Sequence, residues 1–184
     1  DRAVSNFESF KNHVSVLFWS LGNESYAGDI LVEMNRYYKE KDPDRLVHYE
    51  GVAENRPYED LISDMESQMY APPEKIKEYL ENNPKKPFIL CEYMHDMGNS
   101  LGGMESYIRL LDQYEDYQGG FIWDYIDQAL FVKDEVTGRD VLRYGGDFDD
   151  RPSDYEFSGN GILFADRTEK PAMQEVRHYY GLRR

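Results

Sequence analysis

Two glutamates, Glu24 and Glu92, are the residues of this sequence that could act together as an acid and a nucleophile. Each comes where a short apolar run, residues 14–19 and 88–91, gives way to a polar segment that contains glycine. The runs are rich in β-branched and aromatic residues, which is typical of strands buried on both faces of a parallel sheet. Carboxylates at the carboxyl ends of such strands lie where α/β barrels keep their chemistry.

The segments that must position these glutamates alternate between strand and helix patterns. Strands are predicted at 14–19, 46–49, 61–70 with its loop, 87–91 and 120–123, and helices at 4–11, 30–38, 72–80, 104–114 and 171–180. Further on, residues 137–138 indicate a hairpin turn and 144–161 a loop rich in Gly, Asp and Pro. The alternation predicts a parallel sheet with right-handed crossovers, either doubly wound or closed into a barrel.

The barrel is favoured over the doubly wound sheet. No Gly-rich phosphate loop follows the first predicted strand, which weighs against a nucleotide-binding sheet. A (β/α)8 TIM barrel needs eight strands and typically ~250 residues, whereas the patterns here predict about five strands. If this α/β chain is a barrel, it covers roughly strands 4 to 8 with their helices, and roughly its first three units lie outside the chain.

Composition excludes some classes of function. The 184 residues are 40% hydrophobic, enough for one folded unit or part of one. With 21 Lys and Arg against 36 Asp and Glu, the formal charge of −15 argues against binding to nucleic acid or to an anionic membrane. No apolar stretch approaches the roughly 20 residues of a membrane span, and residues 1–5 do not resemble a signal peptide. A cytoplasmic location is slightly favoured over a periplasmic one.

The neighbours of the two glutamates suggest carbohydrate chemistry. The Asn23 amide could bind a sugar hydroxyl while the Glu24 carboxyl reaches the glycosidic oxygen, and the Tyr93 phenol could hold Glu92 ionised. A retaining glycosidase needs two carboxyl groups about 5 to 5.5 Å apart. By itself, an Asn-Glu pair is equally compatible with a helix cap or a surface carboxylate.

Five longer motifs resemble those of glycoside hydrolase family 2 β-galactosidases. They are 19–25 (WSLGNES), 91–103 (CEYMHDMGNSLGG), 118–124 (QGGFIWD), 144–148 (YGGDF) and 160–167 (NGILFADR). They occur in order, at compatible spacing, over nearly the whole chain. The resemblance implies that residues 1–184 are the second half of a catalytic TIM barrel, with the N-terminal strands and accessory β-sandwich domains outside the chain.

The same resemblance implies roles for single residues. Glu24 is the expected acid/base at the end of barrel strand four, and Glu92 the nucleophile at the end of strand seven. Asn23 is expected to contact the sugar 2-hydroxyl, and Tyr70 is expected to hydrogen-bond the nucleophile. His95 is expected to contact a galactosyl hydroxyl, and Trp123 the apolar face of the sugar near C6.

Two ions are implied by the family, and neither site is complete in this chain. Mg²⁺ is expected on Glu24 together with a Glu and a His upstream of residue 1. Na⁺ is expected on the Phe157 carbonyl and on Asn160, with an aspartate upstream. Without the resemblance, His95 would read as a structural histidine and Tyr70 as a core aromatic.

We therefore expect a retaining β-galactosidase that acts on terminal β-D-galactosides and forms a homo-oligomer at full length. Residues 25–28 and 54–69 depart from the family pattern on the aglycone side, which leaves leaving-group preference open. Two alternatives remain: a β-glucuronidase or β-mannosidase of the same family, or a barrel fragment that does not hydrolyse glycosides by itself.

Overall fold

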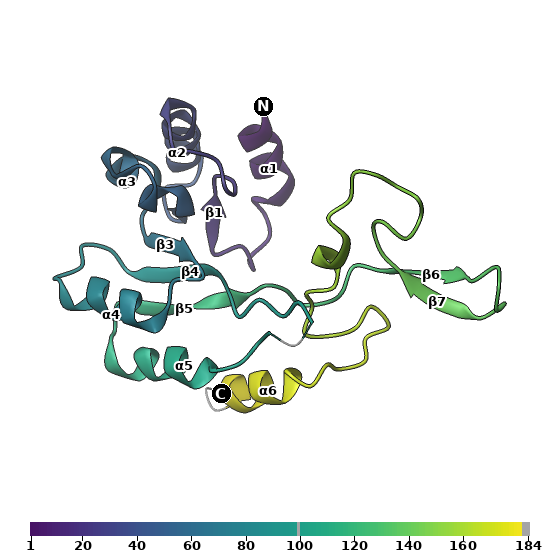
Figure 1. Cartoon of the computed structure of the whole chain (residues 1–184). Helices are drawn as coiled ribbons and strands as arrows, with labels where there is room; N and C mark the ends of the chain where they lie inside the picture. Colours follow the sequence, from purple (N-terminus) through teal and green to yellow (C-terminus); the bar gives the residue numbers. More distant parts are fainter. Residues whose placement is uncertain (99, 182–184) are drawn as a thin grey trace. The chain divides into compact units, whose positions relative to one another are not determined.

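The computed structural model describes residues 1–98 and 100–181, and the chain divides into two compact units. The first unit contains residues 1–91 and 113–119, and the second contains residues 92–112 and those from 120 on. The dividing line passes through two strands, between Cys91 and Glu92 and between Gly119 and Gly120. Figure 1 shows the helices and strands of both units along the chain.

Helices and short strands alternate in the first unit, which confirms the predicted pattern. Its elements are α1 (Arg2–Phe10), β1 (Phe18–Ser20), α2 (Asp29–Lys41), β2 (Leu46–His48), α3 (Glu59–Ile62), β3 (Glu66–Met69) and α4 (Pro73–Glu81). Two 3-10 turns, η1 (Glu50–Ala53) and η2 (Arg56–Tyr58), connect β2 to α3. Strands β1 and β2 are parallel neighbours, with Trp19 opposite Val47.

A second sheet has the strand order β3-β4-β5, in which β4 is Phe88–Tyr93 and β5 is Tyr117–Ile122. Helix α4 connects β3 to β4, and α5 (Met104–Gln113) connects β4 to β5. Crossovers that contain a helix are what neighbouring parallel strands require. Both strands are longer than predicted: β4 continues through Glu92, and β5 begins before residue 120.

The second unit contains a hairpin and two helices that pack together. Strands β6 (Leu130–Lys133) and β7 (Asp140–Arg143) are antiparallel, and the predicted turn at 137–138 joins them. The predicted loop 144–161 contains one 3-10 turn, η3 (Tyr155–Ser158), and α6 (Met173–Gly181) closes the unit. Met104 N–H of α5 donates to Glu175 Oε1 of α6 at 2.8 Å, and both helices contribute to one small apolar core. No helix in the described part of the chain has the length and apolar character needed to cross a membrane.

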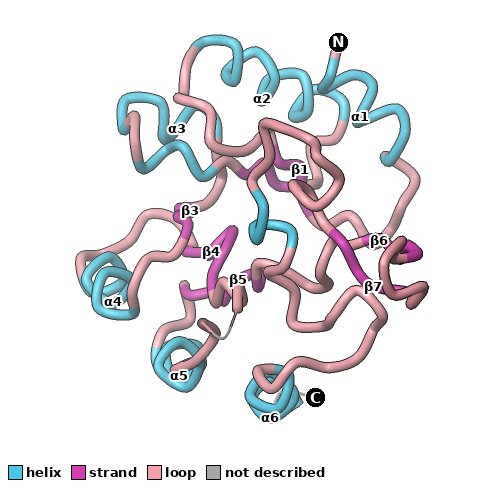
Figure 2. Tube along the Cα trace, turned by 45° about the vertical axis from the view of Figure 1, so that its right-hand side comes forward, coloured by secondary structure: helices cyan, strands magenta, loops and turns pink. Residues whose placement is uncertain are grey.

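An aromatic cluster fills the core between the first helices and β1. The Trp19 ring stacks on Tyr38 with centroids 5.2 Å apart, and Phe7 packs against Trp19 at 5.5 Å. Apolar positions at helical spacing place Phe7 on the inner face of α1 and Tyr38 on that of α2. Figure 2 shows α1 and α2 side by side next to β1, which this cluster holds in place.

Two predicted strands are wrong in part. Val14 and Ser15 lie in a turn that the Val16 N–H closes on the His13 carbonyl at 3.1 Å, and Val14 and Leu17 are 92% and 74% exposed. Residues 14–17 are therefore not part of the strand, which begins only at Phe18. Leu61 and Ile62, predicted within a strand, end helix α3 instead. An apolar pair fits a buried helix turn as well as a strand, so periodicity could not separate the two.

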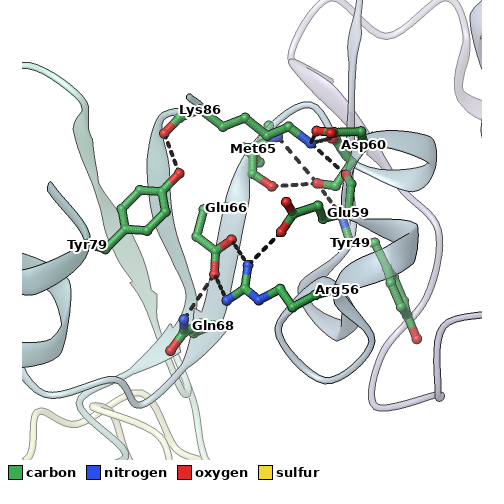
Figure 3. Close-up of polar contacts among 10 residues, drawn as sticks. Tyr49, Arg56, Glu59, Asp60, Met65, Glu66, Gln68, Tyr79 and Lys86 are labelled. Atoms are coloured by element: carbon green, nitrogen blue, oxygen red, sulfur yellow. Dashed lines mark hydrogen bonds and ion pairs between the residues drawn. The ribbon is translucent and has the colours of Figure 1, made fainter. Parts of the chain in front are cut away.

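A network of charged side chains anchors the start of β3 (Figure 3). The Arg56 guanidinium bonds both oxygens of the Glu66 carboxylate, at 2.6 and 2.9 Å, and Gln68 donates to the same carboxylate at 3.0 Å. The Glu66 side chain is 4% exposed and that of Arg56 is 47% exposed. Nearby, Lys86 Nζ donates to the carbonyls of Glu59 and Ser63 at 2.6 and 2.8 Å. These bonds tie α3, β3 and the entry to β4 together.

A buried histidine connects the two sheets within the first unit. His48 Nδ1 lies 3.0 Å from Ser20 Oγ of β1, and Nε2 lies 2.7 Å from Ser67 Oγ of β3. Burial lowers the pKa of His48 to about 4. The imidazole is therefore neutral at pH 7, with one ring nitrogen donating and the other accepting.

Arg56→Ala is predicted to destabilise the first unit by about 2 kcal/mol, because it removes two donors from a buried carboxylate. Arg109→Ala is the matched control, since Arg109 pairs with Glu105 on the exposed face of α5 and should change stability by less than about 0.5 kcal/mol. Urea denaturation of the full-length variants measures both changes. Equal small shifts for the two variants would contradict a stabilising role for the Arg56–Glu66 pair.

Acid pH is predicted to weaken the first unit through His48. Because the folded pKa of about 4 lies below the ordinary 6.5, the unfolded chain binds more protons between these values, and stability falls as pH drops from 6.5 towards 4. The full loss is on the order of 3 kcal/mol. Denaturation midpoints between pH 7 and 4.5 should show this slope, and His48→Gln should flatten it. An unchanged slope in His48→Gln would show that other groups cause it.

Candidate active site

Asn23 and Glu24 lie in the loop that follows β1, in the first unit, and both are exposed. Glu24 has a φ of 56°. Residues other than glycine adopt this left-handed backbone conformation at a cost of about 1 kcal/mol or more. Its N–H donates to Glu50 Oε1 at 2.5 Å. Glu50 opens η1 directly after β2, so the strand pair β1–β2 sets where the Glu24 backbone stands.

Three further bonds hold the same loop. Ser25 N–H donates to the Tyr49 hydroxyl at 3.0 Å, and that hydroxyl donates to the Ser25 carbonyl. Asn55 Nδ2 donates to the Ala27 carbonyl at 2.8 Å. Burial raises the pKa of the Tyr49 phenol, so it keeps the proton that it donates. Side chains after β2 thus fix the loop main chain from Glu24 to Ala27.

Tyr70 also belongs to the first unit and follows β3 directly. Its φ is 52°, and 41% of the residue is exposed. The side chain therefore stands at the carboxyl end of its strand, as Glu24 does beyond the end of β1. This placement agrees with the position that the sequence predicts, while its contact with a nucleophile stays a prediction.

Glu92 is the penultimate residue of β4 and is half-buried, in the second unit. The Tyr93 phenol, expected to hold Glu92 ionised, lies 2.8 Å from the Tyr180 hydroxyl and packs edge-on against Tyr107 at 5.4 Å. Successive side chains of a strand point to opposite faces, so the Tyr93 ring is directed away from Glu92. That expectation is wrong for this reason, and Tyr93 supports the packing of α5 and α6 instead.

His95 and Trp123 follow β4 and β5, and backbone bonds join their two loops. Trp123 N–H donates to the Tyr93 carbonyl at 3.0 Å, and Asp96 N–H donates to the Trp123 carbonyl at 3.1 Å. The His95 ring lies 6.0 Å from that of Phe157, edge to face, and Trp123 is partly exposed. The Trp123–Asp124 peptide is cis. The structure thus brings the predicted residues His95, Trp123 and Phe157 into one unit with Glu92.

Asn160 is buried beside these loops, with 1% of its surface exposed. Its carbonyl accepts from Asp124 N–H at 2.7 Å. Three buried oxygens have no hydrogen-bond partner within residues 1–98 and 100–181: Asn160 Oδ1, Asp124 Oδ1 and Asp96 Oδ2. Burial raises the pKa of Asp96 and of Asp124, with the Lys170 cation opposing that rise. Sequence patterns did not single out the two aspartates, although both lie inside quoted motifs.

The backbone around Asn160 is fixed by a buried ion pair. Lys170 Nζ lies 2.8 Å from Asp127 Oδ1 and donates to the Gly159 carbonyl at 3.1 Å, while Gly161 N–H donates to Asp127 Oδ1 at 2.8 Å. A Cβ on Gly161 would stand 2.3 Å from Asp127 N, so only glycine fits there. This close approach explains the Asn-Gly pair at the start of the 160–167 motif.

Metal ligands are incomplete in the described residues. Nowhere in that part of the chain do three His, Cys, Asp or Glu side chains come together as ligands of one ion. The orphaned amide oxygen of Asn160 fits a hard cation, which prefers oxygen ligands, and this agrees with the predicted Na⁺ role. For Mg²⁺, Glu24 offers an exposed carboxylate, but it is not part of a group of three such ligands in the described residues. Asn99, inside the 91–103 motif, lies outside the described residues.

Known sequences match the chain closely. The model of the TIM barrel domain of glycosyl hydrolases family 2 matches residues 1–183. A β-galactosidase large subunit from Latilactobacillus sakei is 74% identical over 181 residues, which are 98% of this chain and 29% of that protein. A β-galactosidase from Halalkalibacterium halodurans is 62% identical over 98% of this chain and 18% of that protein. The chain therefore spans less than a third of the length of these relatives.

Solved structures share the fold at low identity. The β-galacturonidase from Eisenbergiella tayi, bound to galacturonate, gives a TM-score of 0.62 at 15% identity, over 98% of this chain and 35% of that one. The β-glucuronidase from Lactobacillus rhamnosus gives 0.60 at 18% identity, over 98% of this chain and 35% of that one. At such identities the likeness concerns the fold alone. From the family match and the fold together, the chain belongs to glycosyl hydrolases family 2 and forms part of the TIM barrel domain of that family.

Proposed function

We propose that this chain carries the catalytic carboxylates of a retaining β-galactosidase. The observation that carries the proposal is the 74% identity to a β-galactosidase large subunit over 98% of the chain. Both glutamates predicted from the sequence support it, since Glu92 is the last residue but one of β4 and Glu24 stands in the loop after β1. Carboxylates at strand ends are where this fold keeps its chemistry.

The proposed reaction is a double displacement. The Glu92 carboxylate attacks the anomeric carbon of a terminal β-D-galactoside while protonated Glu24 gives its proton to the departing oxygen. The resulting bond between Glu92 and the sugar is then broken by water, from which Glu24, now a carboxylate, takes a proton. Both carboxyl groups leave this cycle in the states in which they entered it.

The remaining proposed residues bind the sugar or orient the nucleophile. Trp123 offers a partly exposed ring to an apolar sugar face, and His95, beside Phe157, offers a ring nitrogen to a galactosyl hydroxyl. Asn23 is proposed to bind the 2-hydroxyl and Tyr70 to hydrogen-bond Glu92. The left-handed backbone of Tyr70 supports a functional position, because such conformations concentrate at active sites.

Two ions belong to the proposal. Asn160 Oδ1 and the Phe157 carbonyl would hold Na⁺, a cation that binds oxygen ligands and would place a positive charge near the sugar. Glu24 would be one ligand of Mg²⁺, with the other ligands upstream of residue 1. The unpaired buried oxygen of Asn160 supports the first assignment.

For the whole protein we propose that residues 1–184 supply strands 4 to 8 of the barrel. The identity to relatives of which the chain covers 29% or less supports further strands and domains outside it. The proposed substrate is a β-galactoside rather than nucleic acid or a membrane, in keeping with the net charge of −15. Assembly of the full-length protein into an oligomer is supported by the description of one relative as a large subunit.

Replacing the nucleophile tests the proposal. Glu92→Gln in the full-length protein is expected to lower the turnover of a nitrophenyl β-galactoside by at least about 10³-fold, because an amide cannot form the glycosyl intermediate. Glu105→Gln, on the exposed face of α5, is the matched control and should keep full activity. Unchanged turnover in Glu92→Gln would refute its role. Nitrophenyl β-glucuronides and β-mannosides in the same assay distinguish the other activities.

The sodium assignment has a separate test. Asn160→Ala should raise the Na⁺ concentration that gives half-maximal activity by about tenfold, since one ligand bond to an ion is worth roughly 1.4 kcal/mol or more. Asn160→Asp keeps an oxygen at the same position. It should reach half-maximal activity at a lower Na⁺ concentration than Asn160→Ala. Identical Na⁺ curves for the wild type and both variants would remove Asn160 from the site.

A further inference from the structure

The main chain of Glu24 depends on a second, buried carboxylate. Glu50 is 7% exposed, and its Oε1 accepts the Glu24 N–H at 2.5 Å. A carboxylate acceptor makes this bond stronger than a bond between neutral groups. The Glu24 side chain itself is exposed, so packing within the first unit does not fix its direction. Its direction is instead set by the backbone that the Glu50 carboxylate holds.

The backbone at Glu24 needs such a bond because its conformation is costly. A φ of 56° places Cβ close to the following carbonyl, and a left-handed residue other than glycine persists only where its surroundings enforce it. Releasing the N–H from Glu50 would let the loop return to ordinary φ values. That change would redirect the Cα–Cβ bond, and the carboxyl at its end would move by several ångströms.

The segment after β2 is built to hold this loop closely. Tyr49 bonds both main-chain groups of Ser25, and Asn55 bonds the Ala27 carbonyl. A Cβ on Gly51 would lie 3.0 Å from the Ser25 carbonyl and 2.5 Å from the Tyr49 ring, so glycine permits the approach. Glu50 is the member of this set that bonds Glu24 itself.

We propose that Glu50 is a positioning residue for Glu24, which it holds in its left-handed conformation through the Glu24 N–H. This inference rests on the proposed acid/base role of Glu24. It assigns Glu50 no contact with substrate and no proton transfer. Its effect on the reaction is therefore confined to the step in which Glu24 must reach the glycosidic oxygen.

That step can be isolated by the choice of leaving group. An alkoxide is a poor leaving group and needs a proton in the transition state, whereas a dinitrophenolate departs without one. The ratio kcat/KM reports the first, bond-breaking step of a double displacement. A misplaced acid should thus lower kcat/KM for an alkyl galactoside or lactose and leave that for a dinitrophenyl galactoside nearly unchanged.

The experiment compares Glu50→Ala, Glu50→Gln and Glu40→Ala in the full-length protein. Glu50→Ala is expected to lower kcat/KM for lactose about 10- to 100-fold, because a misplaced acid loses part of the roughly 10²- to 10⁴-fold that general acid catalysis contributes. For the dinitrophenyl substrate the expected loss is less than about threefold. Glu50→Gln retains an acceptor oxygen and should recover most of the lactose activity. Glu40→Ala removes an exposed carboxylate from α2, in the same unit, and should match the wild type.

The outcomes separate the inference from the function on which it rests. Equal losses on both substrates in Glu50→Ala, or no loss on lactose, would overturn the positioning role. A loss in Glu50→Gln as large as in Glu50→Ala would also overturn it, since the bond and not the charge is proposed to act. Glu24→Ala is measured alongside: if it too shows no dependence on leaving group, the acid/base assignment of Glu24 fails first.

Discussion

The hydrogen bond from the Glu24 N–H to Glu50 is the interaction through which the packing of the first unit positions Glu24. The aromatic core of Phe7, Trp19 and Tyr38 fixes β1, and β1 pairs with β2. The end of β2 then delivers Tyr49 and Glu50 to the loop that follows β1. The position of the exposed Glu24 carboxylate thereby depends on the packing of this aromatic core.

Left-handed residues recur at the ends of strands. Glu24 follows β1, Tyr70 follows β3 and Met94 follows β4, and none of them is glycine. Such conformations cost about 1 to 3 kcal/mol each and persist where the surroundings enforce them, most often at functional sites. Four other non-glycine residues among those described share the conformation in turns and loops, so the feature is informative only together with its place after a strand. Of the three that follow strands, Glu24 and Tyr70 are themselves proposed site residues, and Met94 precedes His95.

Much of the fold could be predicted from the sequence, because its helices have amphipathic spacing and its central strands are continuous apolar runs. The errors fell where the apolar signal was short: residues 14–17 precede the strand, and Leu61 and Ile62 end a helix. Glu24, Glu92 and their motif neighbours could be named because they lie in long motifs. Glu50, His48 and Asp96 could not, because a single buried polar residue leaves no periodic pattern, and its partners come from distant parts of the chain. The direction of the Tyr93 ring followed from strand alternation only once the bounds of β4 were known.

A covalent intermediate on the nucleophilic carboxylate is the chemical event that defines a retaining glycosidase, and Glu92 is the residue proposed to form it. A 2-fluoro galactoside with a dinitrophenyl leaving group should trap it. Fluorine at C2 slows both displacements, and the good leaving group restores the rate of the first one only, so the intermediate accumulates. Incubated with the full-length protein and digested, the sample is predicted to yield a peptide that carries one fluorogalactosyl group on Glu92. A label on another residue, or a protein that turns over galactosides and remains unlabelled, would contradict this account.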